Sequence, residues 1–287
     1  MADAPSLRLL VDSWDLFRDP VLVGAAAGCV LGYMGVYIVL RRMVFVAATL
    51  SQAAGLGVAL AFYAEIHLGA TGLFAAPRAW AFALALATAI VLRWDGGRMI
   101  TREGLLALAY LLGGAGALLV GTRITQEAHD IQGILFGTGV LVSPEDLTWV
   151  LGTGAVALVW QVWWRRGFLL ASLDPDGAHV RGLPVVLLDG ILLATIAVLV
   201  SVATRALGAL PVFAFSVLPA LAALMLAASP GQALAIAALL GLLSGSAGYV
   251  LAFFAQFPVG ASQTFTAAAF VLLALAWKAA LQALRAT

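Results

Sequence analysis

The side chains in this sequence that could handle a solute form a small polar patch inside a long apolar stretch. Between Arg41 and Ala61, the polar side chains that follow the paired arginines are those of Thr49, Ser51 and Gln52. Hydroxyl and amide oxygens bind a hard cation weakly, because they lack the charge that offsets the dehydration of an ion. The same groups form hydrogen bonds between membrane helices, each worth about 0.6–2 kcal/mol. The patch therefore fits either the lining of a transport pathway or a contact between helices.

Side chains that could bind a metal ion strongly are few. The chain has three histidines, and its one cysteine, Cys29, lies in an apolar run, which excludes a cysteine-based metal cluster and an intrachain disulfide. For each histidine, an exposed or hydrogen-bonded side chain is the simpler alternative to a metal ligand. The candidates for contact with a metal ion are His67, His129 and Asp130, with Glu65 and Glu127 close to them in sequence.

The composition places these residues in a membrane protein. Hydrophobic residues make up 63% of the chain, charged residues make up 10%, and the mean hydropathy is +1.07. A soluble domain has about 45–50% apolar residues. The composition therefore predicts a protein embedded in a lipid bilayer. The net charge of +1 excludes a strongly basic nucleic-acid-binding protein, so no nucleic-acid partner is expected.

A membrane-spanning helix needs about 20 apolar residues, and nine stretches of the chain approach or exceed this length. The sequence therefore predicts an all-α, polytopic transmembrane bundle of about nine spans over residues 20–287. The polar connections between the stretches are short except at 123–145 and 165–185. The nine stretches are 20–40, 45–66, 78–94, 103–122, 146–164, 186–204, 208–228, 232–254 and 262–282.

The first 19 residues differ from the rest. They carry four aspartates and lack the short apolar core and small-residue cleavage site of a signal peptide. A helix with one apolar face lies in the membrane interface, so residues 1–19 are predicted to form an amphipathic surface helix. The apolar residues that recur at helical spacing are Leu7, Leu10, Val11, Trp14 and Phe17.

The positions of Lys and Arg predict the orientation, because cytoplasmic loops accumulate positive charge. With the turn at Arg41 and Arg42 inside, ten of the fifteen basic residues are cytoplasmic. This asymmetry favours an N-terminus outside and a C-terminus inside the cytoplasmic membrane. Asp189 would then enter the membrane at its inner edge, where it is expected to pair with a basic loop residue or stay at the interface. The five basic residues left outside are Arg8, Arg18, Arg78, Arg123 and Arg205.

The connection 123–145 is predicted to lie outside. Its apolar centre, 131–142, is too short to cross a membrane, which suggests a re-entrant or interfacial helix. Ser143, with Asp146 three residues later, fits a capping box at the start of the next span.

The segment 172–184 within the second long connection is predicted to form a short helix on the cytoplasmic surface. Asp174 before Pro175 favours a helix start, Gly182 favours a helix end, and Pro184 prevents continuation. A helix lying parallel to the membrane in this position suits docking onto a soluble partner.

Glycines and prolines predict how the helices meet. Glycines on one helix face allow a second backbone to approach closely, either within one subunit or between two copies. Pro219 inside 208–228 should kink or break that span. Broken helices occur at membrane depth where protein or a water-filled cavity covers the freed backbone groups, so both a pathway lining and a structural kink stay open. The glycine faces are Gly24, Gly28, Gly32 and Gly35, and Gly241, Gly245 and Gly248.

Five segments, taken in order from about Val21 to Ala280, resemble the permease subunits of the zinc and manganese ATP-binding-cassette importers. They are GVYIVLRRMVFVAATLSQAAGLGVALA at 35–61, HDIQGILFGTGVLVSPEDL at 129–147, LDPDGAHVRGLPVVLLD at 173–189, RALGALPVFAFSVLPALAALMLA at 205–227, and GYVLAFFAQFPVGAS at 248–262.

This resemblance implies a permease dimer that works with two cytoplasmic ATPases and an external solute-binding protein that delivers a metal ion. The chain lacks a G-x-x-x-x-G-K-[ST] phosphate-binding loop and is not expected to hydrolyse ATP itself. No covalently bound cofactor is expected. The polar patch and the mid-span proline predict a substrate pathway at Thr49, Ser51, Gln52 and Pro219. The resemblance implies that the segment containing Asp174, Asp176, Ala178, His179, Arg181 and Gly182 is the coupling helix that docks on the ATPase.

One departure from the family bears on the cargo. Members usually carry an aspartate and, four residues later, a histidine where this chain has Ala48 and Gln52, and an acidic residue where it has Gly104. An Asp–His pair at that spacing shares a helix face and can hold a divalent ion. On the resemblance, the predicted function is still an importer permease for zinc or manganese. The alternatives are the same architecture moving a non-metal solute, and a membrane scaffold or sensor that does not transport.

Overall fold

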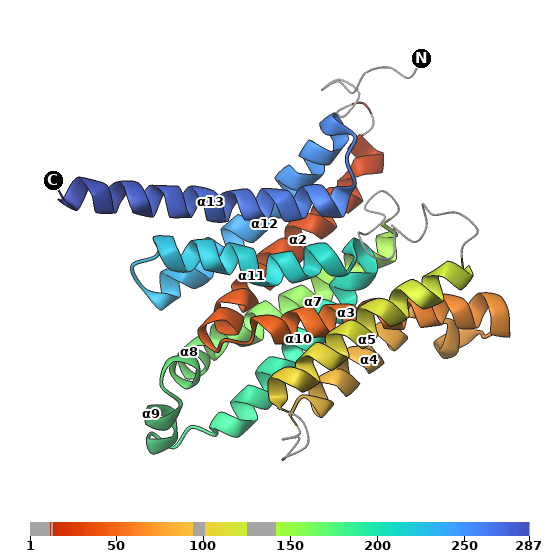
Figure 1. The fold of residues 1–287 in the computed structure, drawn as a ribbon, viewed down its shortest axis with the longest axis horizontal. Coiled ribbons are helices and arrows are strands. Elements are labelled where there is room, and N and C mark those ends of the chain that lie inside the picture. The colour runs from red at the N-terminus through yellow and green to blue at the C-terminus, as the bar shows by residue number, and fades with distance from the viewer. Residues whose placement is uncertain (1–11, 13, 94–100, 125–141, 287) are drawn as a thin grey trace.

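The computed structural model describes residues 12, 14–93, 101–124 and 142–286, and the regular elements within these ranges are all helical (Figure 1). This confirms the predicted all-α class. The elements are α2 (Trp14–Leu40), α3 (Val44–Leu68), the 3₁₀ turn η1 (Gly72–Ala75), α4 (Pro77–Val91), α5 (Arg102–Ile124), α7 (Pro144–Trp163), α8 (Arg165–Leu173), α9 (Pro175–Val180), α10 (Val185–Leu207), α11 (Ala209–Leu226), α12 (Pro230–Ala255) and α13 (Val259–Ala286).

Seven of the described helices are long and apolar enough to cross a membrane, namely α2, α3, α5, α10, α11, α12 and α13. The helices α7 and α8 form an eighth candidate span that is bent by 73° at the break between them. The remaining predicted stretch, 78–94, falls on α4, which is apolar but has only 15 residues. The prediction of about nine spans is thus confirmed as an approximate number.

The helices pack as two groups that share a boundary (Figure 1). In one group α2 packs against α11 and α12, and α13 covers those two helices. In the other group α3 packs against α4, α5 and α10. The groups are joined because α7 lies against both α2 and α10, and α11 lies against both α2 and α3. As a result α3 is surrounded on most sides by other helices.

The glycine faces explain the close contact between α2 and α12. A Cβ atom on Gly28 would overlap the Gly241 carbonyl oxygen, and one on Gly245 would overlap the Gly24 carbonyl oxygen. A side chain at any of these positions would push the two backbones apart. The predicted small-residue faces therefore meet each other within a single chain.

The described helix boundaries bear on two sequence-based expectations, the surface helix over 1–19 and the kink or break at Pro219. Trp14 to Asp19 are the first turns of α2, which continues through Pro20 without a break, so the described part of 1–19 is not a separate helix. The earlier residues of that segment lie outside the described part of the chain. The helix α11 runs unbroken through Pro219. Pro219 is buried beside Gly32 of α2, where neighbouring helices enclose the backbone that the proline frees.

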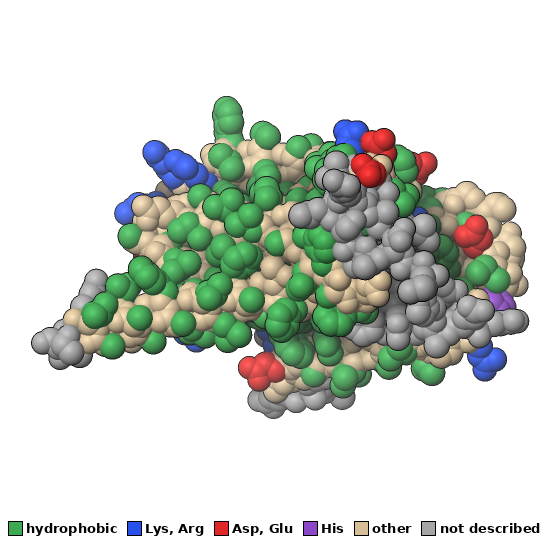
Figure 2. All heavy atoms as spheres, turned by 90° about the horizontal axis from the view of Figure 1, so that it is seen from above, with side chains coloured by type: hydrophobic (Ala, Val, Ile, Leu, Met, Phe, Trp, Pro, Cys, Tyr) green, Lys and Arg blue, Asp and Glu red, His purple; other side chains and the backbone are tan. Residues whose placement is uncertain are grey.

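The surface of the chain is strongly apolar. Hydrophobic side chains cover most of the face in Figure 2, as expected for a protein that meets lipid. The helix α13 is the extreme case, because only 11% of its most apolar window is buried within the chain. Its exposed side chains include Phe265, Leu272 and Trp277. This helix can satisfy its apolar surface only against lipid or another protein.

Candidate pathway and coupling surface

The polar patch on α3 is buried between helices. Thr49 and Ser51 have no exposed surface. The Thr49 hydroxyl lies 2.8 Å from the Phe45 carbonyl oxygen of its own helix and 3.3 Å from the Leu106 carbonyl oxygen of α5. The Ser51 hydroxyl donates to the Ala48 carbonyl oxygen at 2.9 Å. These bonds satisfy both hydroxyls without a solute, and Thr49 joins α3 to α5.

Gln52 occupies a different position from the two hydroxyl residues. It is half-buried, and its side chain carries no hydrogen bond among the described residues. Two glycines of α5 leave room for it: a Cβ on Gly113 would lie 2.9 Å from the Gln52 carbonyl carbon, and a Cβ on Gly114 would lie 3.3 Å from the Gln52 Oε1 atom. The Gln52 amide therefore lies at the contact between α3 and α5, where its oxygen and N–H groups are available for a hydrogen bond or a ligand.

Ala48 lies one turn before Gln52, on the same face of α3, and is 2% exposed. A methyl group at this position offers nothing to a cation. The resemblance implies an aspartate and a histidine at these two positions, whereas this face of α3 carries Ala48 and Gln52 and therefore no charge.

The predicted metal-binding residues do not come together in the described part of the chain. His67, at the end of α3, stacks on Tyr63 with ring centroids 4.5 Å apart, and both His67 and Glu65 are exposed. His129 and Asp130 lie outside the described residues. Within the described ranges, no group of three or more His, Cys, Asp or Glu side chains could hold a metal ion.

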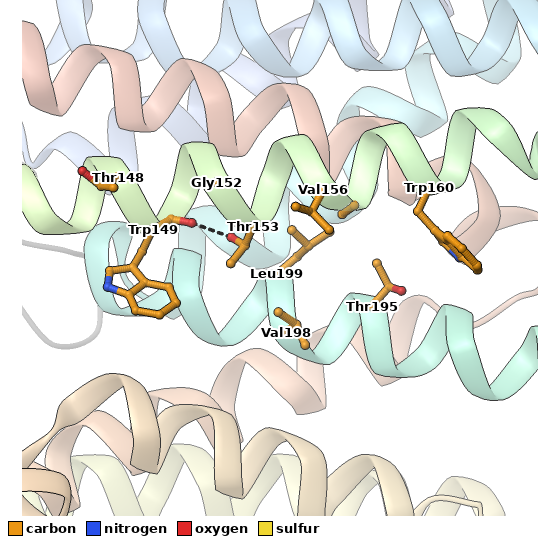
Figure 3. Close-up of a pocket in the computed structure, with 10 residues that line it drawn as sticks. Thr148, Trp149, Gly152, Thr153, Val156, Trp160, Thr195, Val198 and Leu199 are labelled. Atoms are coloured by element: carbon orange, nitrogen blue, oxygen red, sulfur yellow. Dashed lines mark hydrogen bonds between the residues drawn. The ribbon is translucent and has the colours of Figure 1, made fainter.

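A groove of about 560 Å³ lies between α7 and α10 (Figure 3). Trp149 and Trp160 mark its two ends, and Thr153, Val156 and Thr195 lie between them. The Thr153 hydroxyl already donates to the Trp149 carbonyl oxygen. The lining offers no carboxylate or imidazole to a cation, so the groove is unsuited to a divalent ion and fits apolar groups instead.

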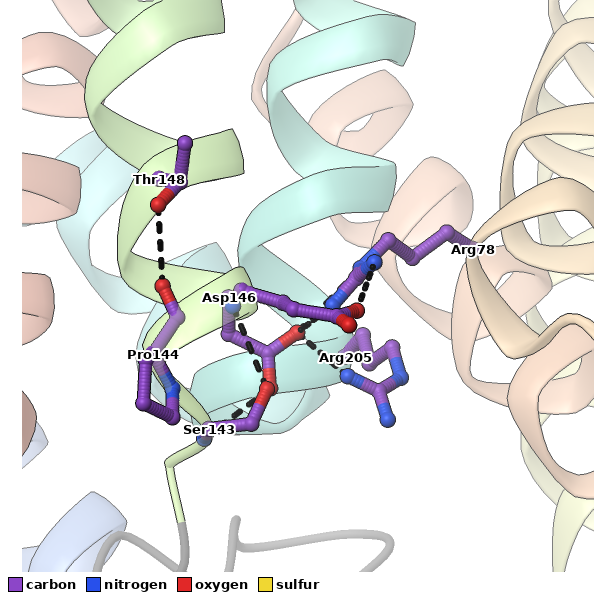
Figure 4. Close-up of polar contacts among 7 residues, drawn as sticks. Arg78, Ser143, Pro144, Asp146, Thr148 and Arg205 are labelled. Carbon is purple, nitrogen blue, oxygen red and sulfur yellow. Dashed lines mark hydrogen bonds and ion pairs between the residues drawn. The ribbon is translucent and has the colours of Figure 1, made fainter.

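A cluster of charges fastens one end of the bundle, here called the Asp146 end (Figure 4). Asp146 receives Arg78 of α4 at 2.9 Å and also pairs with Arg205 of α10. Its other carboxylate oxygen accepts the Ser143 hydroxyl at 2.8 Å, and its backbone N–H donates to the Ser143 oxygen at 3.2 Å. The predicted capping box is therefore confirmed, and it orients a carboxylate that links three helices.

The opposite end of α10 carries a second cluster, here called the α9 end. Arg41 follows α2 and pairs with Asp189 in the first turns of α10. The Arg41 Nε atom also donates to the Ser172 hydroxyl at 2.8 Å. The expected pairing of Asp189 with a basic loop residue is confirmed. These bonds tie the α2–α3 turn to the ends of α8 and α10.

The short helix α9 is formed as the sequence predicts. The Asp174 carboxylate accepts the Gly177 N–H at 2.9 Å and so caps the helix start. Gly182 takes a φ of +76°, a conformation that glycine adopts without strain. Ala178 is fully buried and holds the helix against the rest of the chain.

The outer side of α9 is exposed in the described part of the chain. Val180 is 87% exposed, which is a large value for an apolar side chain in a polar connection between helices. The other exposed residues of the segment 172–184 are Leu173, Asp174, Pro175, Asp176, His179, Arg181, Gly182 and Pro184. The segment therefore presents a mixed charged and apolar surface on a rigid, capped turn of helix.

Sequence reasoning missed several features that depend on distant residues. Arg78, Asp146 and Arg205 come from three helices, and each arginine is more than 50 residues from the aspartate. The bend between α7 and α8 was not predicted either. The signal available in the sequence was a charged residue at the edge of an apolar stretch. Such a residue is expected to have a partner, but the sequence does not identify which residue that is.

Comparisons with known proteins give one family and consistent relatives. The model of the ABC 3 transport family matches residues 13–278. The chain is 25% identical to the manganese import system permease protein ScaB of Streptococcus parasanguinis, over 92% of this chain and 91% of that protein. It is also 25% identical to the high-affinity zinc uptake system membrane protein ZnuB of Haemophilus influenzae, over 91% of this chain and 97% of that protein.

A solved structure has the same fold. PsaBC from Streptococcus pneumoniae, determined in complex with a Fab, matches with a TM-score of 0.81 and 22% identity. The match covers 94% of this chain and 95% of the solved chain. At this identity the similarity establishes the arrangement of helices.

Proposed function

The chain belongs to the ABC 3 transport family, and on that basis we propose that it is the permease subunit of an ATP-driven importer of divalent metal ions. The observation that carries the proposal is the family match over residues 13–278, which spans every described helix except the last turns of α13. The relatives named for manganese and zinc uptake supply the class of cargo.

The proposed cargo route follows the contact between α3 and α5. Thr49 and Ser51 are satisfied inside the bundle, whereas the half-buried Gln52 has a free amide against Gly113 and Gly114. Gln52 is therefore the residue on this face that offers an oxygen to a passing ion. A neutral oxygen binds a divalent ion weakly, which suits rapid release and leaves capture of the ion to another protein.

Energy reaches this route through α9. ATP hydrolysis takes place on separate ATPase chains, and the exposed surface of α9 and its flanking turns, 172–184, fits into a groove on that ATPase. Closure of the ATPase dimer on ATP binding would move α9, and Ala178 would transmit the movement because it is buried against the chain. The route would then switch from outward to inward access.

The remaining parts of the assembly follow from the same family. We place the α9 end in the cytoplasm and the Asp146 end outside the cytoplasmic membrane, where a solute-binding protein delivers the ion. The N-terminus is outside and the C-terminus inside. A second copy of the permease completes the transporter, and the apolar, exposed α13 supplies surface for contacts with lipid or with that copy.

The test is uptake into proteoliposomes that contain the full-length permease, its ATPase and its binding protein. We expect ATP-dependent accumulation of manganese or zinc inside the vesicles. Absence of both, with an ATPase that still responds to the binding protein, would contradict the metal assignment.

The same vesicles distinguish the two alternatives. A permease for another solute is favoured by the loss of the Asp–His pair at Ala48 and Gln52, and it predicts ATPase stimulation by a binding protein loaded with that solute. A scaffold or sensor predicts no stimulation by any loaded binding protein. The genes beside this one give a quick indication, because a neighbouring histidine-rich binding protein would favour zinc.

A further inference from the structure

A basic cavity at the α9 end is not used by the proposed transport cycle. It has a volume of about 470 Å³ and lies where the ends of α2 and α4 meet the starts of α3, α5 and α10. Its charged lining residues are Arg41, Arg93, Arg102 and Asp189. Among the described lining residues, three arginines against one aspartate leave an excess of two positive charges, which favours an anion.

Arg41 shows that this cavity has unused binding capacity. Its side chain is only 10% exposed and is fixed by Ser172 and Asp189. Its Nη2 atom is nevertheless buried without a hydrogen-bond partner in the described residues. Buried donors in folded proteins are nearly always paired, because an unpaired donor has lost its bonds to water. The orphan Nη2 group therefore points to an acceptor that enters the cavity.

Arg93 and Arg102 add two further guanidinium groups to the lining of the cavity. Within the described part of the chain, neither makes an ion pair within 4 Å. Gly190 of α10 lets Arg93 reach its place, because a Cβ at that position would lie 2.7 Å from the Arg93 Nη1 atom. Arginine binds phosphate oxygens through two parallel N–H bonds, so this set of side chains suits a phosphate group in particular.

The cavity opens onto an apolar groove, which indicates the rest of the ligand. A neighbouring groove of about 800 Å³ follows α10 from Pro184 to Ala194 and reaches His179 and Gly182 of the coupling segment at one end. Arg93 and Val186 line both spaces, so a single molecule can occupy the two together. Val186 is 72% exposed and Leu187 is 60% exposed, and both apolar side chains would be covered by a hydrocarbon chain. A free phosphate ion would fill only the basic part.

We propose that this site binds an anionic phospholipid, with its phosphate group against Arg41, Arg93 and Arg102 and an acyl chain along α10. Basic pockets between membrane helices at a membrane surface bind such headgroups. The site joins α2, α4, α5 and α10 at the end where α9 lies, so a bound lipid would brace the helices beneath the coupling surface. The proposal does not depend on which cargo is carried.

Native mass spectrometry of the full-length permease in detergent tests the proposal. We expect phosphatidylglycerol to remain bound about tenfold more than phosphatidylcholine of the same chain length, because only the first carries net charge. Arg93→Gln and Arg102→Gln should each reduce retention of phosphatidylglycerol about fivefold. Gly190→Val should also reduce it without changing the charge, since it displaces the Arg93 side chain.

Arg42→Gln is the matched control, because Arg42 is the exposed neighbour of Arg41 and does not line the cavity. Equal retention of the two lipids, or an equal loss in the Arg42→Gln variant, would overturn the proposal. Binding of inorganic phosphate without preference between lipids would identify a site for a free ion. Unchanged lipid retention in Arg93→Gln and Arg102→Gln, with weaker ATPase association, would identify a protein contact. Either result would also overturn it.

Discussion

The helix that carries the proposed route and the helix that carries the proposed coupling are held in opposite ways. The middle of α3 is enclosed by α4, α5, α10 and α11, and its hydroxyls are satisfied inside the chain. In the helix α9, Ala178 is buried and Gly177 is half-buried, and the other four residues are exposed. An enclosed helix can admit an ion only if a neighbour moves, whereas an exposed and capped helix is ready to bind.

The largest effect expected from this contrast is at Gly182. Its φ of +76° and the open space around it mean that Gly182→Glu should weaken ATPase association and lower ATP-dependent uptake by about tenfold or more. Gly72→Glu is the control, because Gly72 also has a positive φ, of +63°, and open space, but lies between α3 and α4. Pull-down of the ATPase by each variant measures the difference. Equal association of both variants would show that α9 is not the docking surface.

A smaller effect is expected at the Asp146 end, which belongs to the enclosed part of the chain. The Asp146 side chain is 7% exposed, so Asp146→Asn leaves Arg78 and Arg205 without their shared carboxylate and should cost about 3 kcal/mol of unfolding free energy. The Asp189 side chain is 49% exposed, and Asp189→Asn should cost less than about 1 kcal/mol. Denaturant unfolding in detergent compares the two. A larger loss of unfolding free energy for Asp189→Asn than for Asp146→Asn would contradict the view that the Asp146 cluster contributes more to stability.

The contact between α3 and α5 gives a third, smaller effect. Gly113→Ala would place a Cβ 2.9 Å from the Gln52 carbonyl carbon and should destabilise the fold by about 2 kcal/mol, because the backbone cannot give way easily. Gly152→Ala has nothing within 4 Å and should be neutral or slightly stabilising, since alanine favours a helix over glycine. Thermal unfolding of both variants provides the measurement. No difference between them would mean that α3 and α5 are already loosely packed.

Local signals in the sequence predicted the local structure well. The capping box at Ser143, the cap at Asp174 and the end of α9 near Gly182 each depend on residues a few positions apart. The apolar stretches predicted the helices for the same reason, because length and hydropathy are properties of one segment. The ATP-binding-cassette permease class was read from the order of the segments, and the family match confirms it.

Features that depend on which helices meet were beyond the sequence. Nothing near Asp146 indicates that Arg78 and Arg205 would reach it, and nothing near Thr49 indicates a bond to Leu106. Pro219 is a second case, since the local rule allows a break there while α11, packed against α2, continues through it as one helix. Tertiary contacts decide both cases, and they require the fold.

The most direct test of the account is the amount of manganese or zinc taken up per ATP hydrolysed by a Gln52→Leu permease in proteoliposomes. Leucine keeps the size of the side chain and removes the amide that faces α5. The account predicts that uptake falls about tenfold or more while ATPase stimulation by the binding protein stays within about twofold of wild type, because coupling at α9 is intact. Uptake per ATP equal to that of the wild type would contradict a cargo route past Gln52.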